Sequence, residues 1–327
     1  MKLLSIFSSL VVSTNILAQY GPINASDGIV NGVYITENIP TKKMIPYEFV
    51  READVIWSKR VWQTIDLREK MNHSLYFPLD NYDSRSNWVK NSSRWSLWTI
   101  LKTHVLNGDL RVFSPYNPQQ FTIVDGDDLK YPIDPIPGKN YYTDSNFRSE
   151  IFSCLGRLGP IPTLGRIDDN GEPIMILDKD GNLVPDYPPR DTSWFLSEDI
   201  IQYRLKEDWF MDKERGVMDV RIIAIAPVIY DKDDSGQIIG TRELFWLYFP
   251  HCRFVLNNYY AFNSKNDAQW MSFDDLFWKR KFSSSIYKES NVYDREIGTY
   301  KTGIDALFEA DKIKEEVRTI EHDVWSF

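Results

Sequence analysis

Imidazole side chains are where acid–base or metal chemistry would be expected first in this sequence. The chain has four, scattered along its length: His73, His104, His251 and His322. No two of them lie at the helical spacing that would bring two rings to one metal ion. Glu321-His322-Asp323 places carboxylates beside an imidazole, but neighbouring residues on a helix point in different directions. We interpret this triplet as a solvated or capping cluster, with a catalytic role as the alternative.

Common signatures of catalysis are missing from the sequence. It has no Gly-x-Ser-x-Gly motif, no His-Glu-x-x-His motif and no glycine-rich phosphate loop. The 47 carboxylates leave a glycosidase-type pair open as an alternative, yet no pattern singles out two of them. The residues alone therefore single out no catalytic or cofactor-binding residue, and an exported hydrolase that uses two of the carboxylates stays open as an alternative.

One segment, Asp231-Lys232-Asp233-Asp234-Ser235-Gly236, has the residue types of a calcium-binding loop. Oxygen-bearing side chains occupy loop positions 1, 3 and 5, and glycine occupies position 6. Position 12 should be a bidentate glutamate, but it is Arg242, and Glu243 comes one residue late. A polar turn between two strands explains the same residues, so we predict a turn without metal and keep calcium binding as the alternative.

Cys154 and Cys252 are the only cysteines. Neither has a histidine or the other cysteine at metal-ligand spacing, which argues against a zinc site. An oxidising compartment would permit a disulfide between them, and two inert buried thiols are the alternative.

Three strand patterns would position these residues. Between Ile201 and Met211 apolar side chains alternate with polar ones, interrupted once by Glu207. Val217–Tyr230 is a long β-branched run, and Leu244–Phe249 is an aromatic one that includes Trp246 and Tyr248. Because short turns join these consecutive runs, they predict an antiparallel sheet. We expect a fourth strand within 252–260.

Helical patterns precede and follow the strands. Apolar residues recur every four positions from Ala53 to Ile65, which predicts a helix that begins near Glu48. A second helix is expected at 94–107 with Gly108 as its stop, and two more at 273–280 and 304–324. The last helix carries a narrow apolar seam of six residues: Ala306, Ala310, Ile313, Val317, Ile320 and Val324. The seam either docks on the chain's own sheet or is offered to another protein.

Together these elements predict an α+β fold, with an antiparallel meander sheet and helices from both ends of the chain packed on it. Residues at about 115–195 hold 11 of the 17 prolines, so we predict a long irregular insertion there. Within it, a short apolar run at 174–177 between two Asp/Gly turns predicts a small β-meander. One domain, 46–327, would carry the insertion.

The first 18 residues have the pattern of a secretory signal peptide, with Lys2 before an apolar stretch and Ala18 at the expected cut. Residues 19–45 look like a flexible leader. No later run reaches the roughly 20 apolar residues of a membrane-spanning helix. A net charge of −9 argues against nucleic-acid binding. We expect an exported, acidic protein.

Several segments, in order, resemble the GldN (PorN) family of gliding motility proteins. They are Arg51–Asn72, Glu207–Asp212, Arg221–Pro227, Leu244–Pro250, Phe273–Phe277 and Glu321–Phe327. The resemblance covers residues 46–108 and 196–327, and the proline-rich middle departs from the family pattern.

This resemblance implies a non-enzymatic, structural role in the type IX secretion system, which also serves gliding. It implies a periplasmic location and a ring under the outer membrane, built with a GldK/PorK-like lipoprotein and with self-association of this chain. Contact with a GldM/PorM-like periplasmic domain is also implied. The alternative from the residues alone is a glycan- or peptidoglycan-binding module that uses exposed aromatic rings as stacking platforms. A row of exposed tryptophans in a groove would favour that alternative.

Overall fold

An eight-stranded antiparallel sheet is the centre of the fold in this computed structural model. Its strand order is β16-β1-β10-β11-β13-β4-β5, and β12 pairs with β11. The structure describes residues 43–84, 87–120, 124–158, 175–177, 183–185, 192–233, 236–263, 266 and 271–325. All of them belong to one unit, Lys43–Phe327. The predicted signal peptide and nearly all of the predicted leader lie outside the described residues.

The strands of the large sheet are β1 (Val55–Asp66), β4 (Val112–Phe113), β5 (Pro132–Ile133), β10 (Ile200–Asp212), β11 (Val217–Lys232), β12 (Ile238–Glu243), β13 (Trp246–Tyr248) and β16 (Ser285–Glu289). Four small pairs are β2 (Asn81–Tyr82) with β3 (Trp88–Val89), β6 (Gly156–Leu158) with β9 (Thr192–Trp194), β7 (Met175–Leu177) with β8 (Leu183–Pro185), and β14 (Tyr260–Ala261) with β15 (Met271–Ser272). The helices are α2 (His73–Tyr76), α3 (Leu97–Asn107), α4 (Ser145–Leu155), α5 (Phe249–Leu256), α6 (Phe273–Trp278) and α7 (Ile304–Trp325). Short 3₁₀ turns lie at Glu52–Asp54, Lys70–Asn72, Gly126–Asp128, Ser197–Asp199 and Ile297–Thr299. The α+β class is confirmed.

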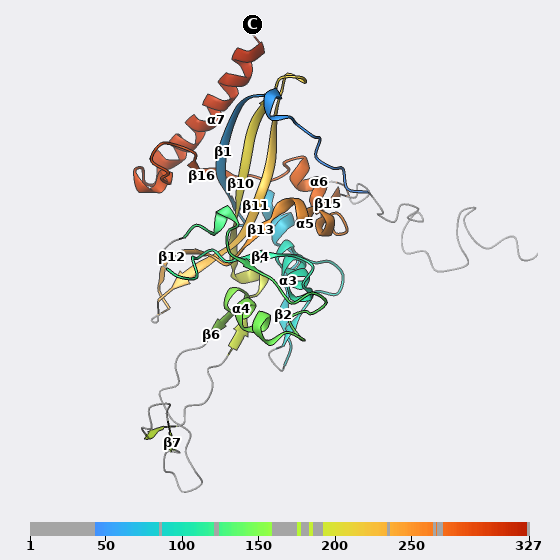
Figure 1. Cartoon of the computed structure of the whole chain (residues 1–327), viewed down its shortest axis with the longest axis vertical. Helices are drawn as coiled ribbons and strands as arrows, with labels where there is room; N and C mark the ends of the chain where they lie inside the picture. Colours follow the sequence, from blue (N-terminus) through green and yellow to red (C-terminus); the bar gives the residue numbers. More distant parts are fainter. Residues whose placement is uncertain are drawn as a thin grey trace, which may run out of the picture. The chain divides into compact units, whose positions relative to one another are not determined.

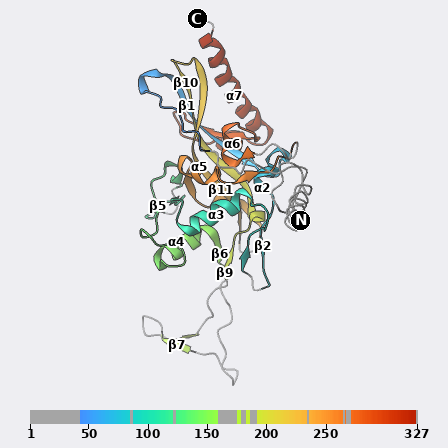
Figure 2. The ribbon, with the colours of Figure 1, turned by 90° about the vertical axis from the view of Figure 1, so that its right-hand side faces the viewer.

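Three long strands, β1, β10 and β11, run side by side, and α7 lies along them (Figures 1 and 2). The β10–β11 hairpin pairs from Asp212↔Val217 to Ile200↔Ile229, and Gly216 supplies the positive φ of +63° in the turn. This hairpin and the 213–216 turn confirm the sequence prediction. The predicted third strand is shorter than expected, because β13 covers only Trp246–Tyr248.

The predicted first helix is wrong, because Val55–Asp66 forms strand β1 in the middle of the sheet. A spacing of four residues is also a multiple of the strand period of two, so Trp57, Val61 and Ile65 share one face in either conformation. β-branched and aromatic side chains favour the extended form. Pairing with β10 along the whole length then holds the segment as a strand.

The helix predicted at 94–107 is confirmed as α3. Ser96 caps its start, where the hydroxyl accepts a hydrogen bond from the Thr99 N–H at 3.2 Å. Gly108 ends it with a φ of +83°, a conformation that glycine adopts without strain. The helices predicted at 273–280 and 304–324 are confirmed as α6 and α7.

The predicted fourth strand is wrong, because α5 occupies Phe249–Leu256. Its buried residues are Phe249, Cys252, Arg253 and Leu256, which is the spacing of one helix face. Pro250 lies in the first turn, where its missing N–H leaves no backbone hydrogen bond unmade.

The proline-rich region contains a regular element that the sequence reasoning missed. Helix α4 buries Phe147, Ile151 and Leu155 in the main core. Of the predicted small meander, the described residues form the antiparallel pair β7–β8. The domain boundaries otherwise stay a prediction.

Two apolar cores share one face of the long strands. Ile65 and Leu205 pack in the larger core with α3, α5 and α6, whereas Val61 packs under α7 with Ile313. The alternation of side chains puts Gln63 and Glu207 on this same face, between the two cores. A fully buried carboxylate therefore lies at their junction.

Candidate functional site

The histidines do not assemble a catalytic centre among the described residues. His104 donates or accepts at both ring nitrogens, with Asp109 Oδ2 at 2.7 Å and the Tyr259 hydroxyl at 2.8 Å. This chain of groups ties the end of α3 to the segment after α5, and no described cavity opens onto it. His73, His251 and His322 are exposed. Only the side chain of Glu321 is partly covered in the predicted C-terminal triplet.

The acidic turn does not show a metal site within the part that is described. No group of three or more potential ligands that could hold a metal ion occurs among the described residues. Asp234 and Ser235 lie outside them. Arg242, at the position that calcium loops give to glutamate, instead points its Nε towards Asp231 Oδ1, 3.8 Å away. Gly236 has a φ of +80°, as a polar turn between β11 and β12 requires.

Both thiols are buried and free, so the predicted alternative of two buried cysteines holds and the disulfide does not. Burial raises the pKa of Cys154 to about 11 and that of Cys252 to about 12. Since the thiolate is the reactive form, neither cysteine is a nucleophile at neutral pH.

A charged cavity of about 220 Å³ lies where β11, α5 and α6 meet. Its lining residues are Tyr47, Met218, Asp219, Val220, Ile222, Phe249, Arg253, Asp274, Phe277, Trp278 and Arg280. The Arg280 guanidinium binds Glu207 in a bidentate way, at 2.9 and 3.1 Å. Glu207 also accepts hydrogen bonds from Gln63 and Trp209, so its carboxylate is fully paired although it is 0 % exposed.

Arg280 adopts an unusual backbone conformation to reach Glu207. Its φ is +48°, just after the end of α6, where helices usually place glycine. A non-glycine residue there costs about 1 kcal/mol or more. The ion pair offsets that strain, because an unpaired carboxylate at the junction of two cores would be far costlier.

Arg253 holds the N-terminal part of the described chain against this cavity. Its guanidinium binds Asp274 at 2.7 and 3.1 Å and donates to the carbonyl of Ile45 at 2.7 Å. It also lies close to the rings of Tyr47 and Trp278, at 4.3 and 4.8 Å from their centroids. Burial raises the pKa of Tyr47 to about 12. The buried carboxylates of Glu207 and Asp274 are both paired with arginine, so these ion pairs fix separate segments of the chain together.

The α7 seam, for which contact with another chain was one alternative, and the aromatic strand β13 are mainly internal, with Ala306, Ile320 and Tyr248 half-buried. In the α7 seam, Ala310, Ile313 and Val317 are buried under the helix. Trp246 of the aromatic strand is 1 % exposed. Packing within the chain, the other alternative, therefore explains these residues; the side chain of Val324 is not among those described.

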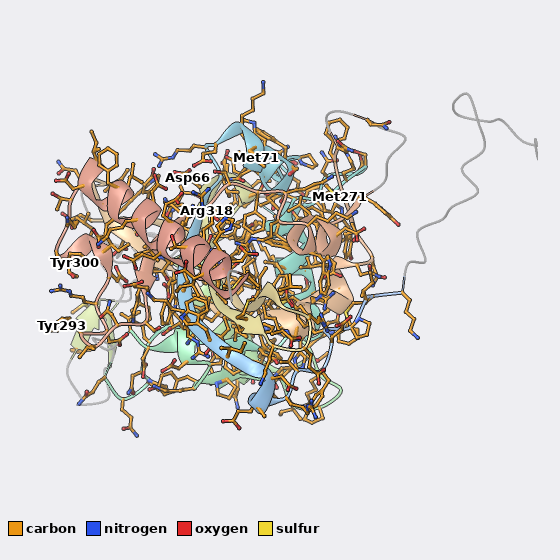
Figure 3. The ribbon with its side chains drawn as sticks, turned by 90° about the horizontal axis from the view of Figure 1, so that it is seen from above. Asp66, Met71, Met271, Tyr293, Tyr300 and Arg318 are labelled. Carbon is orange, nitrogen blue, oxygen red and sulfur yellow. The ribbon has the colours of Figure 1, made fainter. Side chains whose placement is uncertain are left out.

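Large apolar side chains are instead exposed on the other side of α7. Ile304, Leu307 and Phe308, which we call the α7 stripe, are 69 %, 57 % and 67 % exposed. Their spacing of three and four residues marks a second apolar helix face, a signal already present in the sequence. In Figure 3, Tyr293 and Tyr300 lie at the side of the molecule where α7 begins, well away from Met271. Arg295 stacks on both tyrosine rings.

The tryptophans do not form a row of exposed rings. Among those whose side chains are described, only Trp278 is classed as exposed, at 44 %, and Tyr47 stacks on it with a centroid distance of 5.4 Å. The others are buried or half-buried: Trp57, Trp62, Trp88, Trp95, Trp98, Trp194, Trp209 and Trp246. The described part of the chain also contains no helix with the length and apolarity to cross a bilayer.

Comparison with known proteins gives one family. The family model described as "Gliding motility associated protein GldN" matches residues 50–326. No curated protein matches the chain.

Proposed function

The chain belongs to the GldN family of gliding motility associated proteins, and from this premise we propose that it is a non-catalytic structural component of the type IX secretion and gliding machinery. It works in the periplasm as a repeated element of a ring under the outer membrane. A GldK/PorK-like lipoprotein anchors it there, and a GldM/PorM-like periplasmic domain contacts it.

The observation that carries this proposal is the extent of the family match, which spans residues 50–326 and so both apolar cores. The charged groups support a structural role, because the buried carboxylates at the cavity are used in ion pairs between elements. Glu207 of β10 and Arg280 after α6 are 73 positions apart in the chain, and Arg253 joins α5 to both α6 and residue Ile45. Breaking any of these pairs would leave a buried charge without its partner, so the ion pairs hold the elements together as a rigid unit.

The α7 stripe is the surface we assign to contacts of the ring. Three neighbouring apolar side chains that are more than half exposed are typical of a protein–protein contact. Identical subunits that use two different patches close into a ring when the rotation between neighbours allows it. The predicted internal seam lies on the opposite side of the same helix, so α7 is held by the sheet while its stripe faces outward.

The glycan-binding alternative finds less support. A stacking platform needs open ring faces, and the described tryptophans are mostly covered by their own chain. We therefore do not propose it as a second function.

Affinity purification tests the proposal directly. The tagged chain is cross-linked in intact cells and purified from solubilised envelopes, and the co-purifying proteins are identified. We expect the lipoprotein and a ring visible by electron microscopy. The matched variants are Leu307→Asp, on the stripe, and Thr319→Asp, on an exposed part of α7 away from it. Loss of the ring with the first variant alone supports the stripe, whereas recovery of the chain alone, without lipoprotein, would refute the proposed function.

The proposed location has its own test. N-terminal sequencing of protein extracted from envelopes should return a chain that begins at or near Gln19, because residues 1–18 have the signal-peptide pattern. An intact Met1 on the extracted protein would contradict export by this route.

A further inference from the structure

A groove lined by three arginines lies between α4, the β6–β9 pair and β12. Its volume is about 730 Å³, and its lining residues are Tyr141, Ser145, Arg148, Ser149, Phe152, Ser153, Gly156, Arg157, Trp194 and Arg242. In Figures 1 and 2, α4 and β6 lie next to each other below the long strands. We call it the arginine groove.

One face of α4 forms its wall. Ser145, Arg148, Ser149, Phe152 and Ser153 follow a spacing of three and four residues, so they project from the same side of the helix. The opposite side of α4 is buried in the main core, which fixes this wall in place. An exposed helix face with hydroxyls, one aromatic ring and a cation is thus held rigidly towards the groove.

The floor of the groove requires a glycine. A Cβ on Gly156 would lie 2.4 Å from the ring of Phe152, so any larger residue would displace that ring. Phe152 in turn packs edge-to-face on Trp194, with a centroid distance of 5.3 Å. The groove is therefore preformed, with an aromatic floor under the arginines.

Its charge is opposite to that of the chain as a whole. The protein carries a net charge of −9, yet none of the described lining residues is a carboxylate. Arg157 and Arg242 form long ion pairs with Asp199 and Asp231, at 3.6 and 3.8 Å, and neither contact is short enough for a hydrogen bond. The Nε of Arg242 is buried without a hydrogen-bond partner. Arg148 donates to the carbonyls of Tyr141 and Tyr142, and it forms no ion pair with a carboxylate of the described residues.

We infer that the arginine groove binds an acidic segment of a partner protein, whose carboxylates pair with Arg148, Arg157 and Arg242. Guanidinium groups bind carboxylates in a bidentate geometry, and three of them on a preformed surface select a segment with several Asp or Glu residues. Aromatic rings between the cations receive the apolar parts of that segment. That the partner is a protein rests on the proposed structural function; the charge of the ligand rests on the groove alone.

A sugar polymer fits the groove less well than an acidic peptide. The rings of Tyr141 and Phe152 each pack edge-to-face on Trp194, and the ammonium of Lys102 lies 5.0 Å from the centroid of Trp194. These rings therefore do not present a series of open, parallel faces on which sugars would stack.

Peptide binding to the full chain tests the inference. The probe is fluorescein-labelled hexaglutamate, its uncharged comparison is hexaglutamine, and a muropeptide from peptidoglycan serves as the glycan probe; all are followed by fluorescence anisotropy. We expect hexaglutamate to bind at least tenfold more tightly than hexaglutamine at 50 mM salt. Its affinity should fall several-fold at 200 mM salt, because screening weakens contacts between exposed charges.

Variants with equal changes in charge separate the groove from the general surface. Arg148→Gln/Arg157→Gln/Arg242→Gln should lose at least tenfold in affinity for hexaglutamate. The control Arg51→Gln/Arg111→Gln/Arg318→Gln removes three exposed arginines elsewhere and should change it less than twofold. Arg157→Gln alone, at a half-exposed side chain, gives a readout if the triple variant fails to fold.

Equal losses in the two triple variants, or equal binding of the two peptides, would overturn the inference. Arginine-dependent binding of the muropeptide without binding of hexaglutamate would replace the peptide with a glycan. Hexaglutamate binding is measured on the isolated chain. Its result is therefore independent of whether the ring is found in envelopes.

Discussion

Lys102 provides the sharpest test of how this protein handles buried charge. It lies on α3 and is 0 % exposed, and its Nζ donates to the carbonyl of Phe195 at 2.9 Å. Desolvation by burial lowers the pKa of Lys102 from 10.5 to about 7, opposed by the nearby charges of Asp80 and Asp199. A lysine whose pKa is lowered on folding makes stability depend on pH in a defined direction.

Below pH 7 Lys102 is protonated in both the folded and the unfolded chain, so it contributes no pH dependence there. Between pH 7 and 10.5 the unfolded chain binds a proton that the folded chain has released, and the free energy of unfolding rises with pH. A difference of one bound proton changes the free energy of unfolding by about 1.4 kcal/mol per pH unit. From pH 7 to 9.5 the increase due to Lys102 can therefore be at most roughly 3.4 kcal/mol. The ring of Trp88 lies 4.1 Å from the ammonium and favours the cation, so we expect about 1–3 kcal/mol.

The assay is urea unfolding followed by tryptophan fluorescence at steps from pH 6 to 9.5, for the natural chain and for Lys102→Met. Methionine keeps the volume and removes the charge, and the Phe195 carbonyl keeps a second donor, the indole N–H of Trp98 at 3.2 Å. Folding raises the pKa values of Cys154 and Cys252 above the value near 9 of a thiol in the unfolded chain. Above that pH the unfolded chain loses these protons first, so the two thiols lower the free energy of unfolding as the pH rises. That contribution is the same in both proteins and cancels in their difference.

We expect the difference in unfolding free energy, natural chain minus variant, to rise by about 1–3 kcal/mol from pH 7 to 9.5. At pH 6 the variant should be the more stable of the two, since it no longer buries an ammonium. A difference that stays constant within about 0.5 kcal/mol over this range would refute the reasoning, because it would mean that Lys102 keeps its proton throughout.

Three further expectations follow from packing and pairing. Ile313→Asp should destabilise the chain by about 3 kcal/mol or more in urea unfolding because it buries a charge under α7, whereas Leu307→Asp, on the exposed stripe, should change it by less than about 0.5 kcal/mol. Arg280→Met should lower the free energy of unfolding by about 3–5 kcal/mol, because it removes the cation that pairs with the buried Glu207 carboxylate. The double variant with Glu207→Leu should recover most of this loss, and no recovery would show that the ion pair is not its cause. Gly108→Ala should lower the stability by about 1 kcal/mol through its φ of +83°, and an unchanged melting temperature would contradict this.

Much of the local structure could be predicted from the sequence alone. The alternation in β10, the turn before β11 and the capped helix α3 are decided by side chains within a few positions of each other. The α7 stripe is also visible as spacing, although the sequence reasoning followed only the buried seam of that helix. Local steric preference and the burial of one face are enough for such elements, since both act within the segment itself.

The tertiary structure decided what the local pattern left open. The spacing of apolar residues in Val55–Asp66 fits a helix or a strand, and only the pairing with β10 selects the strand. A lone carboxylate on an apolar strand face signals a buried partner, but nothing near Glu207 in sequence identifies Arg280 as that partner.

Sequence composition determined that the chain is acidic and poor in catalytic motifs, while the arginine groove exists only because folding brings α4, β6 and β12 together. The physical reason is the same in each case. A sequence pattern records which side of its own element a residue faces, whereas burial, ion pairing and local charge depend on the elements that pack against it.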